Sequence, residues 1–352
     1  MPTVPLPDDL RDALTDRLRA TVPSRAWPQV ERLIENYRGT TPTAAPVLRD
    51  AADAAAYAAY RMPATYAAVR AALEALREQA GAWTPATHLD LGGGTGAATW
   101  AVAGTWADAP APHTSTVLDW SQAALDLGRD LARLAELPAV RDAAWTRAPL
   151  GGTPRLPAAD LVTVSYVVGE LTAADRGALV DAAAAATRGA LVIAEPGTPD
   201  GYARIVEARA RLVAAGLTVL APCPHDAACP VTGTDWCHFA ARVPRTSLHR
   251  RIKGGTLPYE DEKFSYVAAV RPAAVPAVPA ANRVVRHPQI RKGQVLLDLC
   301  TRDGALTRAT VTKRHGADYR VARDTDWGDP WPPPATAPDG GQRPEPAPQS
   351  QP

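Results

Sequence analysis

Residues 88–96 read His-Leu-Asp-Leu-Gly-Gly-Gly-Thr-Gly, a short apolar run that passes directly into a glycine-rich loop. A segment with helical character, 97–103, follows this loop. Glycine adopts backbone conformations that are closed to other residues and lets the chain approach a ligand closely. In an open α/β sheet, a strand, a glycine loop and a helix in this order place a ligand at the carboxyl end of the strand. We therefore predict a nucleotide-binding loop here.

Short apolar runs alternate with helical segments beyond this loop, which is typical of parallel strands joined by crossover helices. The expected strands are 88–91, 115–118, 160–168 and 190–194. This pattern predicts an α/β fold with a Rossmann-like domain over residues 85–220.

The acidic residue at the start of the loop narrows the choice of nucleotide. The pattern Asp-x-Gly-x-Gly-x-Gly resembles the signature of S-adenosylmethionine methyltransferases, and the next strand ends in an aspartate that can accept hydrogen bonds from both ribose hydroxyls. The predicted cofactor-binding residues are Asp90, Gly92, Gly94, Gly96 and Asp119. The alternative is a Rossmann-like domain that no longer binds a nucleoside, because folds persist without their functions.

No specific catalytic motif accompanies the cofactor signature. Amino-methylating enzymes carry Asn/Asp-Pro-Pro-Tyr/Phe after the fourth strand, whereas this chain has Ser165 and Tyr166 there. Tyr166 and Glu170 are the nearest catalytic candidates, although both residue types also serve in packing and at surfaces. Methyl transfer by proximity and orientation alone, and cofactor binding without turnover, both remain open.

The remaining segments differ in composition from this α/β domain. Residues 1–84 are expected to form a helical region, in which Pro63 should break or kink an alanine-rich stretch. Residues 221–331 are expected to form a module with β-like runs at 294–299 and 319–322, after a proline-rich linker at 272–281. The tail 332–352 is rich in proline and is expected to be disordered.

The chain has four cysteines, all in its second half. They are Cys223, Cys229, Cys237 and Cys300. In a reducing compartment cysteines serve as ligands or catalysts more often than as disulfides. Their long, irregular spacing lacks the paired Cys-x2-Cys knuckles of zinc ribbons, and prolines flank two of them. A loop around a cubane iron–sulfur cluster fits this pattern. Zinc, with His225 or His238 as a substitute ligand, is the first alternative. The second alternative is that the four cysteines are buried or free and hold no metal.

The net charge of +1 conceals a strongly basic segment. Between residues 237 and 323 there are seventeen Lys or Arg residues against six Asp or Glu residues. Such a segment favours a polyanionic partner, most simply RNA, and a solvated basic face is the alternative. The predicted RNA-binding residues are Arg242, Arg245, Arg250, Arg251, Lys253, Arg286, Arg291 and Lys292.

Two further expectations concern the setting of the protein. No run of about 18 apolar residues occurs, so we expect no membrane span. The acidic residues near the N-terminus argue against a transit peptide, and no apolar segment marks a secretory signal. We therefore expect a cytoplasmic protein, and a monomer.

Three motifs together carry a resemblance to a known family. Residues 222–266 contain Pro-Cys-Pro-His, Trp-Cys-His-Phe and Glu-Asp-Glu-Lys-Phe-Ser-Tyr, residues 89–96 contain the glycine loop, and residues 297–304 read Leu-Asp-Leu-Cys-Thr-Arg-Asp-Gly. With the closing Trp-Gly-Asp-Pro-Trp at 327–331, they resemble the methyltransferase-like proteins of the mitochondrial small ribosomal subunit and their bacterial relatives. The likeness runs from about residue 45 to residue 331.

The resemblance implies a methyltransferase-like domain, a [4Fe-4S] cluster on the four cysteines and association with small-subunit ribosomal RNA during assembly. The expected function is that of a methyltransferase-like, iron–sulfur-binding protein that acts on or with this RNA in ribosome assembly or translation. Three alternatives stay open: a catalytically inactive RNA-binding assembly factor, a zinc-stabilised RNA-binding protein and a redox-sensing one.

Overall fold

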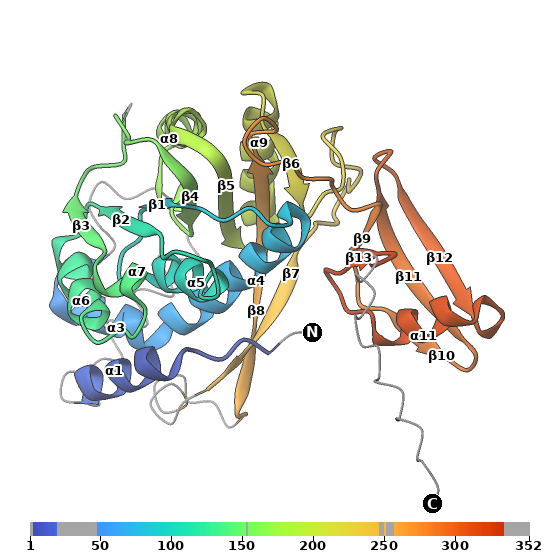
Figure 1. Cartoon of the computed structure of the whole chain (residues 1–352), viewed down its shortest axis with the longest axis horizontal. Coiled ribbons are helices and arrows are strands. Elements are labelled where there is room, and N and C mark those ends of the chain that lie inside the picture. The colour runs from blue at the N-terminus through green and yellow to red at the C-terminus, as the bar shows by residue number, and fades with distance from the viewer. Residues whose placement is uncertain (1–2, 20–47, 153, 246–249, 251–256, 334–352) are drawn as a thin grey trace, which may run out of the picture.

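The computed structural model describes residues 3–19, 48–152, 154–245, 250 and 257–333. Within these residues the chain forms a large sheet flanked by helices and a small second sheet beside it (Figure 1). The α/β class expected from the sequence is confirmed, and the strand order identifies a methyltransferase-like fold.

The large sheet has eight strands among the described residues, in the order β3-β2-β1-β4-β5-β8-β6, with β7 paired to β8. The first five strands of this order are mutually parallel, and β8 is antiparallel to β5 and β6. Strands β2 and β3 follow on one side of β1, whereas β4 and β5 lie on its other side. The topological switch point therefore lies between β1 and β4. The bounds are β1 Thr87–Leu91, β2 Thr114–Asp119, β3 Ala144–Arg147, β4 Ala159–Ser165, β5 Thr187–Pro196, β6 Thr218–Ala221, β7 Phe239–Pro244 and β8 Tyr259–Val270.

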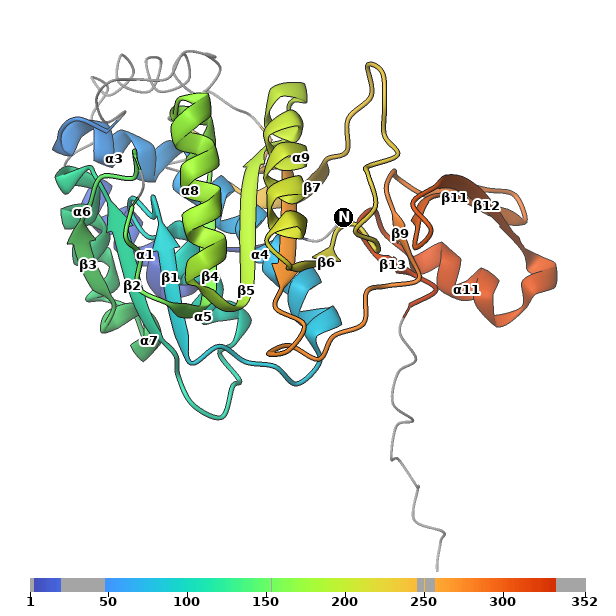
Figure 2. The same ribbon diagram turned by 90° about the horizontal axis from the view of Figure 1, so that it is seen from above.

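Helices cover both faces of this sheet and create two separate cores. Helices α8 (Ala173–Ala186) and α9 (Pro199–Ala214) pack on one face, and the remaining helices of this domain pack on the other (Figure 2). The other helices are α1 Asp8–Arg19, α3 Ala51–Tyr60, α4 Met62–Ala80, α5 Ala97–Thr105, α6 Gln122–Ala132 and the short α7 Pro138–Arg141.

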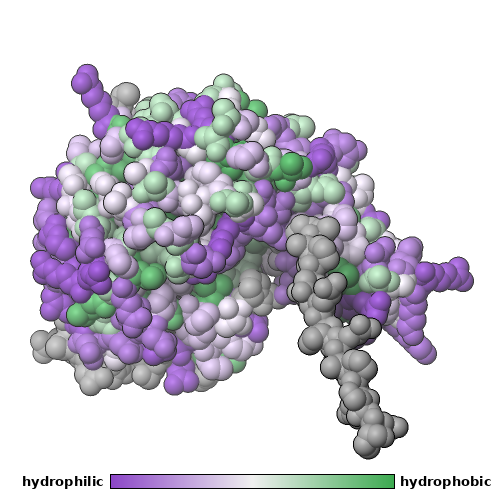
Figure 3. Space-filling model, in the orientation of Figure 1, coloured by the Kyte–Doolittle hydropathy of each residue, from purple (hydrophilic) through white to green (hydrophobic). Residues whose placement is uncertain are grey.

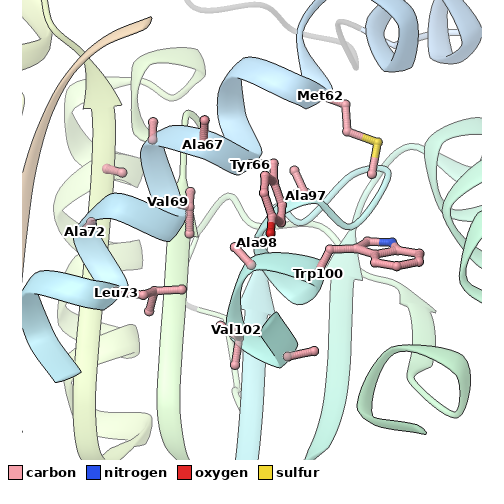
Figure 4. Packing of buried hydrophobic residues seen from close by; sticks show 14 of the residues in the cluster. Met62, Tyr66, Ala67, Val69, Ala72, Leu73, Ala97, Ala98, Trp100 and Val102 are labelled. Atoms are coloured by element: carbon pink, nitrogen blue, oxygen red, sulfur yellow. The ribbon is translucent and has the colours of Figure 1, made fainter. Parts of the chain in front are cut away.

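The N-terminal helices are part of the core of the α/β domain. Side chains of α4, among them Met62 and Tyr66, point toward Ala98 and Trp100 of α5 (Figure 4). The predicted break at Pro63 is confirmed, because α3 ends at Tyr60 and Pro63 lies in the first turn of α4, where a missing N–H costs nothing.

The large sheet continues beyond the predicted domain boundary at residue 220. Strand β8 inserts between β5 and β6, and β7 extends the pairing on the far part of β8. The reason is the apolar run at the end of β8, Phe264–Val270, which is buried throughout. The boundary at 220 therefore does not coincide with the edge of this sheet.

The small sheet forms the C-terminal module. Its strands are β9 Asn282–Val284, β10 Gln289–Arg291, β11 Gln294–Thr301, β12 Leu306–Thr312 and β13 Pro330–Trp331. The β-like run expected at 294–299 is confirmed, whereas the run expected at 319–322 is wrong. It lies in helix α11, Ala317–Asp324, because Tyr319 and Ala322 are spaced to pack on one face against β11.

The predicted linker at 272–281 contains no helix or strand, and Val275 within it is buried. Most of the proline-rich tail lies outside the described residues. Among the helices described, none is long and apolar enough to cross a membrane.

Candidate functional site: a nucleoside cleft and a cysteine cavity

The glycine loop joins β1 to α5 through three residues with positive φ. Gly92, Gly94 and Gly96 have φ angles of 67°, 54° and 89°, a region that disfavours side chains. A Cβ on Gly92 would lie 2.1 Å from Cγ2 of Val167, and one on Gly96 would lie 2.6 Å from Cη2 of Trp145. Glycine at these positions is therefore required by close packing, whereas a Cβ on Gly94 would make only an ordinary contact, 3.8 Å from Oδ2 of Asp119.

Asp90 holds the loop from below and does not line the cleft. Its side chain is fully buried and accepts hydrogen bonds from Thr163 Oγ1 at 2.8 Å and Thr99 Oγ1 at 3.1 Å. Burial raises the pKa of Asp90 to about 6, although these two hydroxyls oppose the shift. The sequence predicted Asp90 as a cofactor ligand, and its geometry is that of a group that positions the loop.

Asp119 ends β2 and faces the cleft. One carboxylate oxygen accepts from the backbone N–H of Gly94 at 2.9 Å, and the other accepts from the N–H of Ser121 at 2.7 Å. Burial raises the pKa of Asp119, and these backbone donors lower it. The carboxylate is thus preorganised at the position where the sequence predicts a ribose ligand.

The cleft lies at the topological switch point, at the carboxyl ends of β1, β2 and β4. Its enclosed volume is about 150 Å³. The lining residues that define this nucleoside cleft are Leu48, Tyr57, Gly92, Gly94, Asp119, Trp120, Ser121, Leu150, Gly151, Ser165, Tyr166, Val167, Glu170, Leu171, Thr172 and Asp175. Every charged side chain among these described residues is a carboxylate.

Glu170 contributes an unusual carboxyl group to the cleft. It sits in the short 3-10 turn Val168–Glu170 after β4. Burial raises its pKa to about 8, and the nearby negative charges of Asp119 and Glu195 add to the shift. In the unliganded protein Glu170 therefore carries its proton at neutral pH and ionises readily when a cation approaches.

Tyr166, the other catalytic candidate, is held by a buried ion pair. Its φ of 61° is unusual for a side chain of this size, and its hydroxyl donates to Glu262 Oε1 at 3.0 Å. Glu262 in turn binds Arg61 through two contacts, at 2.8 and 3.1 Å, and the Arg61 guanidinium lies 5.2 Å from the centre of the Tyr166 ring. Burial and the charge of Glu262 keep the pKa of Tyr166 well above its usual value. Tyr166 is thus a poor general base.

The second candidate site gathers cysteines from distant parts of the chain. Cys223, Cys229 and Cys237 lie on the loop between β6 and β7, and Cys300 lies on β11 of the small sheet. The first three line one small cavity beneath α9, together with Tyr202, Arg209 and Tyr266. Cys300 approaches from the module, with its sulfur 3.4 Å from Nε2 of His225. We call this place the cysteine cavity.

All four cysteines are free thiols. Burial raises the pKa of Cys223 and Cys237, and it raises the pKa of Cys300 to about 12. The thiols also act on one another, because Cys223 and Cys229 raise the pKa of both Cys237 and Cys300. Three of the cysteines thus line one cavity, and Cys300 approaches the same loop beside His225.

Two buried arginines brace the cysteine loop. Arg209 on α9 donates to the carbonyl oxygen of His225 at 2.6 Å, and its Nε has no partner among the described residues. Arg283 on β9 donates to the carbonyl oxygen of Pro222 at 3.1 Å. Both positive charges lower the pKa of Cys223. An unscreened positive charge in a buried site favours an anionic occupant.

Polar contacts from the large domain fix the rest of this loop. The Tyr202 hydroxyl lies 3.1 Å from the sulfur of Cys229, and Ser265 on β8 donates to the carbonyl oxygen of Cys237 at 2.8 Å. Asp226 accepts from the N–H of Val219 at 2.7 Å. Within the described part of the chain, no group of three or more His, Cys, Asp or Glu side chains is arranged to hold a single metal ion.

The basic residues predicted to bind RNA divide into two groups. Arg242, Arg245 and Arg286 form ion pairs, with Asp261, Glu260 and Asp235 respectively. The acidic start of β8 therefore neutralises much of the hairpin charge that the sequence presented. Arg250, Arg291 and Lys292 are exposed. Arg251 and Lys253 lie outside the described residues.

The small sheet adds basic residues that the prediction omitted. The turn between β10 and β11 carries Arg291 and Lys292, and the N–H of Lys313 bonds to the carbonyl of Gly293 in the same turn. Lys313 and Arg314 are exposed and extend the positive surface. Hydrophilic side chains project at this outer end of the module (Figure 3). We call Arg291, Lys292, Lys313 and Arg314 the basic edge.

A family model supplies the independent identification. The model described as mitochondrial small ribosomal subunit Rsm22 matches residues 51–332. The chain belongs to the Rsm22 family. The matched range includes all four cysteines and every lining residue of the nucleoside cleft except Leu48, so both sites belong to the part shared with the Rsm22 family.

Two curated relatives show how much of the sequence this chain shares with other proteins. The human protein named "Ribosome assembly protein METTL17, mitochondrial" is 31% identical over 309 residues, covering 80% of this chain and 65% of the human protein. "Rsm22-cox11 tandem protein 2, mitochondrial" of Schizosaccharomyces pombe is 29% identical over 183 residues, covering 40% of this chain and 24% of that protein. This Rsm22 family chain thus spans just under two thirds of its human relative.

Solved structures with a similar chain path are more distant. An O-methyltransferase family protein from Burkholderia thailandensis has a TM-score of 0.41 and 16% identity, with 74% of this chain and 71% of that chain covered. Magnesium protoporphyrin IX methyltransferase from Synechocystis PCC 6803, solved with bound SAM, has a TM-score of 0.37 and 12% identity, covering 75% and 98%. The fold assignment rests on the strand order of this chain.

Proposed function

We propose that this protein binds S-adenosylmethionine in the nucleoside cleft, holds a [4Fe-4S] cluster on its four cysteines and acts with the small ribosomal subunit during assembly. The observation that carries the proposal is the charge of the cleft at the switch point. It combines a ribose-binding aspartate with further carboxyl groups, and among the described lining residues no lysine or arginine is present.

This charge pattern distinguishes S-adenosylmethionine from a dinucleotide. A dinucleotide brings a pyrophosphate, whose negative charge favours positive partners at the glycine loop. S-adenosylmethionine brings a sulfonium and an ammonium group, and their positive charges are stabilised by Asp119, Glu170 and Asp175. The cleft therefore favours a nucleoside that carries positive charge.

The cleft residues divide the ligand between them. We propose that Asp119 binds the ribose hydroxyls, that Trp120 and Leu150 contact the adenine ring, and that Glu170 binds the cationic end, because all four residues line the cleft. The enclosed volume of about 150 Å³ is below the usual range of ligand pockets. Binding should therefore displace the N–H of Gly94 from the Asp119 carboxylate and widen the cleft.

Bound S-adenosylmethionine supplies an activated methyl group, and this chain's residues would orient it. Tyr166 is engaged with Glu262, so of the two predicted residues only Glu170 could accept a proton, once a bound cation has ionised its carboxyl group. A transfer that needs no strong base proceeds by proximity. We propose methyl transfer to ribosomal RNA as the activity, and cofactor binding without turnover as the second candidate, which the engaged Tyr166 hydroxyl favours.

We assign a polynuclear cluster rather than a zinc ion to the cysteine cavity, because the cysteines lack the paired Cys-x2-Cys spacing of zinc ribbons. Buried Arg209 and Arg283 complement the negative charge that four thiolates bring to a cluster. The thiolates would anchor it, and Cys300 would tie the module to the large domain.

The ribosomal partner is supported by the family and by surface charge. The human relative is named a ribosome assembly protein, and the basic edge offers exposed cations that neutralise phosphates without reading sequence. The cytoplasm and a bacterial small subunit remain predictions from the sequence.

Calorimetric titration of the purified full chain with S-adenosylmethionine tests whether the chain binds this cofactor. We expect one site per chain, and no heat above dilution would refute cofactor binding. Incubation of immature small subunits with the methyl-labelled cofactor then separates the two candidates. Label in the RNA supports the methyltransferase, and its absence alongside binding supports the inactive factor.

Anaerobic purification followed by iron, sulfide and zinc analysis tests the cluster. About four irons and four sulfides per chain are expected for a cubane site. One zinc without sulfide would replace the cluster with a zinc site. Co-sedimentation with small subunits at rising salt tests the partner, and equal binding to large subunits would contradict it.

A further inference from the structure

A third cavity lies between the large domain and the module, outside the nucleoside cleft and next to the cysteine cavity, with which it shares Phe239 and Tyr266. It is bounded by α4, by β7 and β8, and by residues of the module that neighbour them in Figure 1. Its volume of about 310 Å³ is twice that of the nucleoside cleft and reaches the usual range of ligand pockets. We call it the aromatic cavity.

Aromatic rings form one wall of this cavity. The rings are those of Phe239, Phe264, Tyr266 and Trp327. Phe239 lies 6.1 Å from Trp327 and 5.4 Å from Tyr266, measured between ring centroids. A wall of this kind attracts a flat, aromatic ligand through stacking and edge contacts.

Two hydrogen-bond donors at the cavity lack partners. Arg283 is 1% exposed, and its Nη2 has no partner among the described residues, whereas its Nε and Nη1 donate to carbonyl oxygens of Pro222 and Gly328. The indole N–H of Trp327 is likewise buried and without a partner in the described structure. Buried donors without acceptors are costly, so the cavity is built to receive a ligand with acceptor atoms.

Carboxyl groups supply acceptors at the same cavity. Glu78 on α4 is exposed and borders the cavity, and Asp329 also borders it while accepting a hydrogen bond from the N–H of Asp326 at 2.7 Å. Glu74 also borders the cavity, but it is paired with Arg70 at 2.6 Å. Arg283, Glu78 and Asp329 line the same cavity, so it combines a donor group with acceptor groups.

We propose that the aromatic cavity binds a guanine base. Guanine is planar and offers two adjacent acceptors, O6 and N7, to the free N–H groups of Arg283 and Trp327. It is also the base whose N1–H and N2–H lie side by side and can both donate to one carboxylate, here that of Glu78. Adenine presents a donor where guanine presents O6, so it leaves an N–H of the cavity unpaired.

Two sources can deliver this base, a free guanine nucleotide and an unstacked guanosine of RNA. The proposal does not depend on S-adenosylmethionine, because that ligand belongs to the nucleoside cleft and its titration reports on that cleft alone. The shared chemistry is the guanine edge, and the probes below distinguish the sources.

The test uses the full chain and fluorescence anisotropy or calorimetry with four probes. GMP is compared with AMP, and a uridine hexamer with one guanosine is compared with an all-uridine hexamer. A preference for GMP of about fivefold or more over AMP assigns a free nucleotide, and the same preference between hexamers assigns RNA. Equal binding within both pairs overturns the proposal.

Two mild variants tie any preference to the cavity. Glu78→Gln removes the carboxylate at the mouth, and Trp327→Phe removes the indole N–H while keeping a ring. Each should reduce the guanine preference by about threefold or more. Arg283 is left unchanged because it also supports the cysteine loop. Glu207→Gln, an exposed carboxylate on α9, is the matched control.

Thermal unfolding and S-adenosylmethionine titration confirm that each variant is folded. A preference that survives both cavity variants, or one that Glu207→Gln lowers equally, overturns the assignment of guanine to this cavity.

Discussion

The nucleoside cleft and the cysteine cavity have opposite electrostatic characters. The cleft places Asp119, Glu170 and Asp175 around a glycine loop, whereas the cavity places Arg209 and Arg283 around four thiols. Their occupants should therefore have opposite charge, a cationic nucleoside in one and an anionic thiolate cluster in the other. Fixed charge thus favours a different kind of ligand at each site, since carboxyl groups line the cleft and none is present among the described residues that line the cavity.

We expect the largest change on substitution of a cysteine in the cysteine cavity. Cys237→Ser removes one of four converging ligands, so the purified protein should lose nearly all of its iron and become less soluble, because binding of the metal group contributes to folding. Iron analysis and thermal unfolding measure both effects. Thr234→Ala, an exposed change on the same loop, should keep full iron. Normal iron in Cys237→Ser would refute the ligand assignment.

The second largest change is expected in the nucleoside cleft, on loss of the Asp119 charge. Asp119→Asn removes the charge that faces the ribose, and we expect the affinity for S-adenosylmethionine to fall about tenfold to a hundredfold, since hydrogen bonds to charged groups contribute about 1.5–3 kcal/mol. Calorimetry provides the measurement. Asp126→Asn on α6 is exposed and serves as the control. The same affinity in both variants would remove Asp119 from the site, while iron content should be unchanged in either case.

A smaller change is expected when a buried positive charge is removed from beside the cysteines. Arg209→Gln keeps a donor for the carbonyl of His225 but removes the positive charge, so iron should be lost to a chelator several times faster, because the thiolates lose a compensating charge. The rate of bleaching of visible absorption measures this. Arg211→Gln on the exposed side of the same helix is the control. Equal rates for the two variants would show that the buried charge is irrelevant.

The smallest effect is a pH dependence of the cleft. The Glu170 carboxyl has a pKa of about 8 in the free protein, and a bound cation stabilises its ionised form and lowers that pKa. Binding of S-adenosylmethionine should therefore release a proton and strengthen as pH rises from 7 to 9, by about fivefold if the pKa falls by one unit.

Glu170→Gln supplies the control for this pH effect. The variant should bind the cofactor with a nearly flat profile over the same range, and S-adenosylhomocysteine, which lacks the sulfonium, should show a weaker slope in the natural chain. An unchanged slope in Glu170→Gln would assign the effect to another group.

The glycine loop could be located from the sequence because its residues are consecutive. Strand, loop and helix are local, and Asp119 follows at the end of the next strand, so Gly92, Gly94 and Asp119 line the cleft as predicted. The role of Asp90 could not be read in this way. Its partners Thr99 and Thr163 come from α5 and β4, and only the packed sheet brings their hydroxyls below the loop.

The second half was harder to predict because its contacts are long-range. The cysteine set was found by spacing, yet the bracing by Arg209 and Arg283 depends on α9 and β9 meeting the loop. The basic run was overestimated for a similar reason. Arg242 and Arg245 pair across the β7–β8 hairpin with Asp261 and Glu260, which no local pattern reveals. The acidic residues Glu260 and Asp261 at the start of β8 were the sequence signal that could have indicated these ion pairs.

The insertion of β8 between β5 and β6 bears on how the protein is made. When the chain through residue 238 has been synthesised, β6 and the first three cysteines exist, but the strand that borders β6 and supports Cys237 has not yet been translated. The fourth cysteine comes later still, on β11. Because domains begin to fold during synthesis, the large sheet is completed only after its cysteine loop has emerged. The loop that carries three of the proposed cluster ligands is therefore translated before the strand that completes the sheet beside it.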